Sequence, residues 1–415
     1  MSRVVADLHI HSHYSRATSP DMEPAALNRW AKTKGIDILG TGDFTHPQHF
    51  SHLKQCLVSN GKGLFRLKDD PNSTHFLLTA EVSNMYPDKG KGRRIHTLLF
   101  APGFDEVEKI NGMLSGWGKM ASDGRPIFGL PAKHLAETVL NVSDRCMVIP
   151  AHVWTPWFSL FGSESGYDSI EEAYGDMTPH IRAVETGLSS DPSMNWRLSA
   201  LDSITLISNS DAHSPAKLGR EANVLDCGFD YDEIVLILKT KNRDKFLETV
   251  EFFPEEGKYH YDGHRACNIR FSPSETQKHG GICPVCGKSV VVGVMSRVEQ
   301  LADRPEGFKP DNAVPFVRMV PLPEVVAEAM GIGVNTTGVA RQVEQLIRQG
   351  GSEFRILRDL SAADLSSFVP ERIVEGIVRV REGKLFIKPG YDGTYGEVRI
   401  FGEGTEPEKE QMELF

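Results

Sequence analysis

The chain has 415 residues, of which 40% are hydrophobic and 25% charged, enough for two or three domains with buried cores. Its 46 basic and 56 acidic residues give a formal net charge of −10, so no overall positive field attracts nucleic acid, although basic patches remain possible. No apolar run approaches the ~18 residues of a membrane helix, and no signal peptide follows Met1. We therefore expect a soluble, cytoplasmic protein without a membrane partner.

Residues 1–240 alternate short apolar runs with helical patterns, as in an α/β protein. The expected strands are 4–8, 36–40, 76–80, 95–100, 146–149, 181–184 and 204–207. Several are almost continuously apolar, which is typical of parallel strands covered on both faces, and a helix is expected over 22–34. The pattern predicts an α/β barrel or a doubly wound sheet, folds whose active sites lie just beyond the strand ends.

The rest of the chain divides into three parts. Residues 255–300 contain closely spaced Cys and His, which indicates a small metal-stapled module. Residues 301–401 form a mainly helical domain, with a helix expected over 337–349. It ends in a β-hairpin of 384–388 with 397–401, which we expect to join a sheet of an earlier domain. Residues 402–415 form an acidic tail.

Ionisable side chains recur where the predicted strands end. His9 and His11 alternate along an extended segment and therefore project to the same side, which suits two imidazoles on one metal ion. The others are Asp43, Glu81, His96, His152, Glu185, Asp211 and His213. Burying so many such groups would cost several kcal/mol each unless they pair or bind cations, so the set predicts a polynuclear metal site.

The order and context of these residues resemble the PHP (polymerase and histidinol phosphatase) family. The resemblance implies a distorted (β/α)7 barrel with three divalent metals, zinc or alternatively manganese or magnesium. It implies a first site of His9, His11, Glu81 and Asp211 and a second in which Glu81 bridges to His96 and His152. It implies that Asp43 and His213 belong to the third.

The third site is left open because the family's second motif usually has Asp-His, whereas Phe44 follows Asp43 here. His13, His46 or Glu185 could contribute, and Glu185 could instead orient a metal-bound histidine.

Such a cluster favours phosphoester hydrolysis. Divalent cations lower the pKa of bound water and clamp the oxygens of a phosphate. We assign the central catalytic positions to Glu81 and Asp211, and no serine or cysteine nucleophile is required.

A zinc ribbon is predicted from two further pairs. His264 and Cys267 precede Cys283 and Cys286 at the spacing of two knuckles that share one structural zinc ion. His260 or His279 could replace His264. Basic residues around the ribbon are consistent with duplex contact or with simple packing.

Two segments next to the metal site suit nucleic acid. A basic loop with Lys91, Arg93 and Arg94 directly precedes His96 and could grip phosphates. After His152, the aromatic residues Trp154, Trp157, Phe161 and Tyr167 could stack an extruded base, or could form a core under a lid.

The whole chain resembles the endonuclease Q family of PHP-type DNA repair nucleases. The matching stretches are 40–43, 161–167, 259–267 and 388–393. The resemblance implies cleavage of duplex DNA on the 5′ side of hypoxanthine, uracil, xanthine and abasic sites, with the damaged base held in a pocket.

The last residues resemble the bacterial sliding-clamp-binding peptide. Gln411, Leu414 and Phe415 stand at its anchor positions, and an apolar pair at the end of an acidic tail has no packing role of its own.

Two alternatives remain. A small-molecule phosphatase of the histidinol-phosphatase type would leave the ribbon, the basic loop and the tail unexplained. A non-catalytic PHP scaffold is disfavoured by the nearly complete ligand set.

Overall fold

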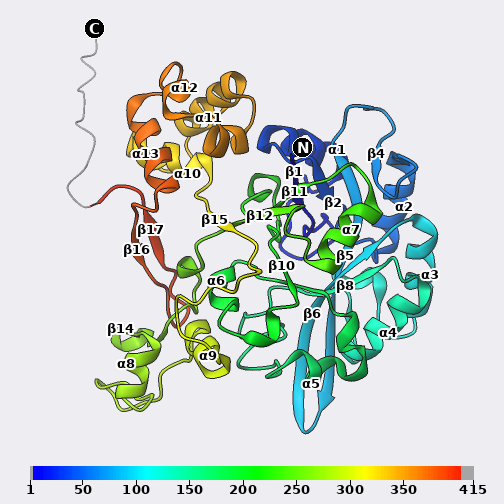
Figure 1. The fold of residues 1–415 in the computed structure, drawn as a ribbon, viewed down its shortest axis with the longest axis horizontal. Helices are drawn as coiled ribbons and strands as arrows, with labels where there is room; N and C mark the ends of the chain where they lie inside the picture. The colour runs from blue at the N-terminus through cyan, green and yellow to red at the C-terminus, as the bar shows by residue number, and fades with distance from the viewer. Residues whose placement is uncertain (1–2, 403–415) are drawn as a thin grey trace.

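A computed structural model describes residues 3–402 and shows a mixed α/β fold, which confirms the predicted class (Figure 1). A large sheet with its covering helices occupies one side. The ribbon and a group of C-terminal helices lie on the other side, joined by a long hairpin.

The main sheet has the path β15-β12-β11-β1-β2-β5-β4-β3, with β6 and β7 paired to β5, and β8 paired to β6. Its strands are β1 (Arg3–Asp7), β2 (Ile38–Gly40), β3 (Leu57–Ser59), β4 (Phe65–Leu67), β5 (His75–Asp88), β6 (Lys91–Ala101), β7 (Ile127–Phe128), β8 (Met147–Pro150), β11 (Ala222–Asp226), β12 (Phe246–Glu251) and β15 (Phe316–Arg318). A separate parallel pair is formed by β9 (Ala183–Glu185) and β10 (Thr205–Ile207).

The sheet is mixed rather than parallel, which corrects the sequence-based expectation. β1, β2 and β5 run parallel, whereas β11, β12, β6 and β8 each pair antiparallel with a neighbour. The apolar runs arise because both faces are covered, and such covering does not require parallel strands. In residues 3–402 the hydrogen-bonded strands form an open path, so the closed (β/α)7 barrel stays a prediction.

The basic segment 89–94 is the end of a β-hairpin and not a flexible loop. β5 and β6 are joined by Lys89 and Gly90 alone, and both have positive φ angles, 49° and 78°. Two-residue turns of this kind match the twist of the strands they connect. The long hairpin projects at the bottom of Figure 1.

Helices cover the sheet and connect its strands. They are α1 (Pro24–Lys34), α2 (Pro47–Cys56), α3 (Phe104–Leu114), α4 (Ala132–Val142), α5 (Ile170–Tyr174), α6 (Pro192–Asn195) and α7 (Tyr231–Thr240). The helix predicted over 22–34 is α1: it starts at Pro24, where the missing N–H is harmless, and ends at Gly35 with φ 89°. Short 3₁₀ helices, labelled η, also occur in this part of the chain: η1 (Met120–Ser122), η2 (Gly175–His180), η3 (Ser199–Leu201) and η4 (Pro215–Lys217).

The ribbon follows η5 (Pro254–Glu256). It is built from β13 (Asp262–His264), η6 (Arg265–Cys267), β14 (Ile269–Phe271) and α8 (Pro273–Lys278), and α9 (Val294–Leu301) leads away from it. β13 and β14 pair antiparallel.

The C-terminal part is helical, as predicted. It contains α10 (Leu322–Met330), α11 (Thr337–Gly350), η7 (Arg355–Asp359), α12 (Ala362–Ser366) and α13 (Glu371–Arg381). α11 confirms the helix expected over 337–349, and the Thr336 hydroxyl accepts a hydrogen bond from Val339 N at its start.

The predicted C-terminal hairpin is present, but within residues 3–402 it does not join another sheet as expected. β16 (Phe386–Lys388) and β17 (Glu397–Arg399) form a two-stranded sheet of their own. The connection between them is held by backbone bonds from Gly390 N to Glu255 O and from Gly396 N to Glu256 O. These contacts connect the hairpin to η5, just before the ribbon. In Figure 1 the hairpin runs from the C-terminal helices down to the ribbon.

The main sheet extends past the expected end of the first domain at residue 240. β12 lies between the predicted domains, and β15 comes from the predicted helical domain of 301–401. The division into domains therefore stays a prediction. Among residues 3–402, no helix has the length and apolar character needed to cross a membrane.

A buried ion pair fastens the C-terminal helices to the first part of the chain. Lys34 Nζ at the end of α1 lies 2.8 Å from Glu353 Oε2, and the two side chains are 4% and 5% exposed. Glu353 also accepts a hydrogen bond from Leu322 N, at the start of α10. The pair thus joins α1 and α10 to the segment between α11 and η7.

We predict that Glu353→Gln lowers the free energy of unfolding by about 3 to 5 kcal/mol, because it leaves the Lys34 charge buried without a counterion. Urea denaturation followed by tryptophan fluorescence measures the change. As a control, Glu344→Gln breaks the exposed pair with Arg348 and is expected to cost less than about 1 kcal/mol. Equal unfolding midpoints for the two variants would contradict the prediction.

Candidate metal centre

Four side chains from distant parts of the chain form the first ligand group. Ligand atoms of His9, His11, Glu81 and Asp211 all lie within 4.8 Å of one another. His11 Nε2 is 3.2 Å from Glu81 Oε2 and 3.1 Å from Asp211 Oδ1. This is the group expected for the first metal.

A second group shares Glu81. Its Oε1 atom lies 2.8 Å from His96 Nδ1 and 3.0 Å from His152 Nε2. Glu81 therefore presents one oxygen to each group, as the bridging position requires, and its side chain is completely buried.

Strand register explains why these residues meet. In the β5–β6 pair, Ser83 lies opposite His96 and Leu98 opposite Glu81, so Glu81 and His96 are diagonal neighbours on one face. His152 follows β8, which pairs with β6. His11 N donates to Ala212 O, which sets Asp211 beside His11.

Three of the predicted residues have left-handed backbone conformations. The φ angles of Asp43, His152 and Asp211 are 45°, 28° and 46°. Non-glycine residues rarely adopt such angles, and the strain is held by the surrounding structure where a side chain must be aimed.

Glu185 orients a histidine rather than belonging to either ligand group. Both of its oxygens lie 3.0 Å from His9 Nδ1, and they also accept from His152 N and Asn209 Nδ2. Both oxygens of this buried carboxylate are thus occupied by hydrogen bonds, and neither ligand group includes Glu185. The structure thus favours the second of the two roles considered for Glu185.

Asp43 has the same relation to His11. Its Oδ1 lies 3.0 Å from His11 Nδ1, and its Oδ2 accepts from Ser12 N and from the hydroxyl groups of Ser12 and Ser15. Although burial acts to raise it, the pKa of Asp43 is held well below its usual value by His11. Asp43 is therefore an ionised carboxylate that fixes the ring of His11.

The third site is not assembled within residues 3–402. Neither Asp43 nor His213 belongs to a group of converging ligand atoms. The ring of His213 lies 4.5 Å from that of His11, and its Nδ1 is 2.9 Å from Asp211 O. His13 and His46 instead flank the ring of Tyr14. The third ligand set stays a prediction.

The donor set fits divalent cations. Nε2 of His9, Nε2 of His11 and Oδ1 of Asp211 are buried without hydrogen-bond partners, although they face one another. Although burial acts to raise it, the pKa of Glu81 is held well below its usual value by His96 and Arg125, so the bridging carboxylate is ionised. Burial lowers the pKa of His96 to about 4, which keeps its ring neutral and able to bind metal.

Arg125 is a site residue that sequence reasoning missed. Its guanidinium donates to Glu81 Oε2 at 2.8 Å. An isolated arginine forms no spacing pattern in the sequence. The only signal nearby is Gly124, since a glycine can mark a position where the backbone approaches another group closely.

Four of the seven predicted DNA-contact residues are buried. They are Arg93, Trp154, Phe161 and Tyr167. Trp154 Nε1 donates to Asn195 Oδ1 at 2.8 Å, and the Arg93 guanidinium lies over the Tyr167 ring. These contacts match the alternative interpretation, a core beneath the loop, and they correct the expected surface role.

The other three candidates are accessible. Lys91 and Arg94 are exposed on β6, and Trp157 is 41% exposed. Trp157 lines a pocket of about 230 Å³ together with Thr155, Ser189, Lys258 and Tyr259. The pocket lies between the loop that follows His152 and the segment that leads into the ribbon.

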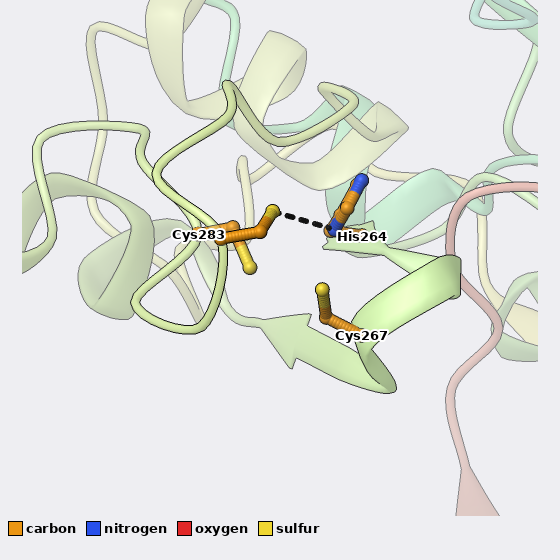
Figure 2. A group of neighbouring side chains, drawn as sticks. His264, Cys267 and Cys283 are labelled. Carbon is orange, nitrogen blue, oxygen red and sulfur yellow. Dashed lines mark hydrogen bonds between the residues drawn. The ribbon is translucent and has the colours of Figure 1, made fainter.

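The ribbon residues form a third ligand group. Ligand atoms of His264, Cys267, Cys283 and Cys286 lie within 4.8 Å of one another, and Figure 2 shows the first three of these side chains pointing toward one another. Although burial acts to raise it, backbone N–H groups of residues 286 and 285 lower the pKa of Cys283 to about 7, which favours the thiolate. His279 stacks on Phe271 and His260 is buried elsewhere, so neither replaces His264.

The chain is similar in sequence and fold to two solved structures. A solved structure described as the lesion-specific endonuclease PfuEndoQ from Pyrococcus furiosus is 33% identical, with a TM-score of 0.85 over 99% of this chain and 98% of that one. A structure of endonuclease Q with a 27-mer duplex carrying an abasic lesion is 34% identical, with a TM-score of 0.84 over 99% and 100% of the two chains.

Two sequence matches extend the comparison. The uncharacterized protein YqxK of Bacillus subtilis is 31% identical over 96% of this chain and all of its own length. Residues 321–384 match the family model of the MJ0043 C-terminal domain.

The fold and its paired ligand groups, taken with these likenesses, define a hydrolase of the nuclease class. The chain belongs to the endonuclease Q family, as expected from its motifs.

We predict that Glu185→Gln lowers zinc affinity at the group of His9, His11, Glu81 and Asp211 by about 10- to 100-fold, because an amide cannot accept all the bonds that orient His9. Titration against a chromophoric zinc chelator measures the affinity. Glu344→Gln, an exposed change on α11, serves as the matched control. Wild-type affinity in the Glu185 variant would show that this carboxylate does not orient a ligand.

Proposed function

We propose that the protein is a metal-dependent DNA repair endonuclease that cleaves the phosphodiester on the 5′ side of deaminated bases, namely hypoxanthine, uracil and xanthine, and of abasic sites. The observation that carries the proposal is Glu81 shared between two ligand groups, in a chain 33% identical over 99% of its length to a lesion-specific endonuclease. The duplex bound by a second relative supports DNA as the substrate.

We assign three divalent metals, zinc or alternatively manganese or magnesium, to a PHP-type barrel and one structural zinc to the ribbon. His9, His11, Glu81 and Asp211 would hold the first, and Glu81, His96 and His152 the second. Asp43 and His213 remain the proposed contributors to the third. Metals bound there supply hydroxide near neutral pH and stabilise charge on the phosphate.

The protein's own side chains supply positioning and charge. Asp43 and Glu185 hold the rings of His11 and His9, so that both Nε2 atoms face Glu81 and Asp211. Lys91 and Arg94 on the hairpin would grip phosphates, since both are exposed on β6, the strand that also carries His96.

The pocket beside Trp157 is the proposed place for the damaged base. Its lining includes Thr155, which follows His152 by three positions in the sequence. Trp157 and Tyr259 contribute aromatic rings to its wall. An extruded base is usually held by such stacking, which depends little on base identity.

The two alternatives are weaker explanations. A small-molecule phosphatase would not need the exposed basic hairpin or the ribbon. A non-catalytic scaffold would not need buried ligand atoms of His9, His11 and Asp211 that lack any other partner.

We predict that Asp211→Ala abolishes nicking of duplexes that carry one deoxyinosine, deoxyuridine or abasic residue, because Oδ1 of Asp211 is a ligand of the first group. Gel electrophoresis of labelled duplexes with Mg²⁺, Mn²⁺ or Zn²⁺ measures nicking. Elemental analysis is expected to find the ribbon zinc still bound.

A small phosphomonoester is assayed in parallel. Hydrolysis of the phosphomonoester alone by the wild type would favour the phosphatase, and inactivity on every substrate would favour the scaffold. Undiminished nicking by Asp211→Ala would show that the catalytic cluster is misplaced.

We also propose that the C-terminal peptide binds the sliding clamp. Gln411, Leu414 and Phe415 lie outside the described residues, so the proposal rests on the sequence alone. Deleting residues 411–415 is predicted to abolish clamp association in a pull-down without changing the nicking of short duplexes. Retained association would refute the assignment.

A further inference from the structure

Arg125 brings a fixed positive charge into the ligand cluster. Its guanidinium lies 2.8 Å from Glu81 Oε2, the oxygen that faces the first ligand group. Glu81 is completely buried, whereas the Arg125 side chain is 29% exposed. Arg125 therefore approaches the cluster from its open side.

The backbone on both sides of Arg125 is held in place. Gly124 N donates to Tyr14 O, and Ser83 N donates to Pro126 O, next to the short parallel pairing of β7 with β5. Gly124 packs so closely that a Cβ there would lie 2.2 Å from Asp43 Oδ2 and 2.3 Å from Ser15 Oγ. The position of Arg125 is thus built into the fold.

A guanidinium at this point works against metal binding. Glu81 must give its oxygens to cations, and a bound arginine competes for one of them and repels the incoming charge. A site that served only to bind metal would gain from a neutral residue. An arginine is useful there when the substrate is an anion that gains charge during the reaction.

We propose that Arg125 is a further catalytic residue, whose guanidinium contacts a non-bridging oxygen of the scissile phosphate. Glu81 Oε2 holds the guanidinium at the open side of the cluster. If Glu81 gave that oxygen to a cation, the phosphate would become the counterion of Arg125. This inference rests on the proposed function.

During hydrolysis the oxygen of water bonds to phosphorus and gives up a proton to solvent, while the bond from phosphorus to the departing oxygen breaks and that oxygen takes up a proton. Negative charge builds on the non-bridging oxygens as the reaction proceeds. A guanidinium already in place stabilises that charge without reorganisation. Loss of Arg125 should therefore slow the chemical step more than it weakens general DNA binding.

The first experiment measures binding to a product that cannot react. Metal-loaded protein is titrated, with fluorescence anisotropy, against two nicked duplexes that carry a 5′-phosphate or a 5′-hydroxyl on the damaged nucleotide. The wild type is expected to prefer the phosphate, and Arg125→Ala is expected to lose roughly tenfold or more of that preference. Arg125→Lys, which keeps the charge, is expected to restore part of it.

Arg16→Ala is the matched control. Arg16 forms an ion pair with Asp123, two residues before Arg125, and the Arg16 side chain itself is 87% exposed. The preference is the ratio of the affinities for the 5′-phosphate and 5′-hydroxyl duplexes, so general effects on DNA binding cancel. Arg16→Ala is therefore expected to keep the wild-type preference.

The second experiment separates catalysis from metal loading. Elemental analysis of Arg125→Ala is expected to show metal contents equal to or above those of the wild type, while kcat for nicking falls by about 100-fold. Metal loss in proportion to activity, or an unchanged preference for the 5′-phosphate in both Arg125 variants, would overturn the role. A wild type that neither nicks damaged DNA nor prefers the phosphate would instead overturn the proposed function itself.

Discussion

The site depends on one interaction: histidine imidazoles and the Arg125 guanidinium converge on a single buried carboxylate, that of Glu81. Two imidazoles approach its Oε1, and two imidazoles and a guanidinium approach its Oε2. A buried carboxylate next to a second one, Asp211, is costly unless cations compensate the charge. The unpartnered nitrogens of His9 and His11 show that the protein alone does not complete this compensation.

The rest of the fold keeps these groups from relaxing away from one another. Asp43 and Glu185 fix the outer nitrogens of two imidazoles, and Asn209 links Glu185 to the backbone of Leu8. The strained backbone at Asp43, His152 and Asp211 is held by hydrogen bonds at each residue. The result is a preorganised cluster, which is what electrostatic stabilisation of a phosphate requires.

The ligand groups could be predicted because they follow from local pattern. The alternation at His9 and His11 and the position of each acid at the end of an apolar run are visible in the sequence. The antiparallel β6 was missed, although Lys89 and Gly90 form a two-residue turn. The sequence left open whether Trp154 stacks a base or forms a core, since its partner Asn195 lies 41 positions away. Arg125 and the orienting role of Asp43 likewise depend on tertiary contacts that no spacing records.

Anomalous diffraction at the zinc absorption edge, from a crystal grown with zinc, tests the central claim most directly. The account predicts a peak at the ribbon and at least two more within coordination distance of the Glu81 carboxylate, one on each oxygen. A single peak at the ribbon, with Glu81 still paired to Arg125, would contradict the account.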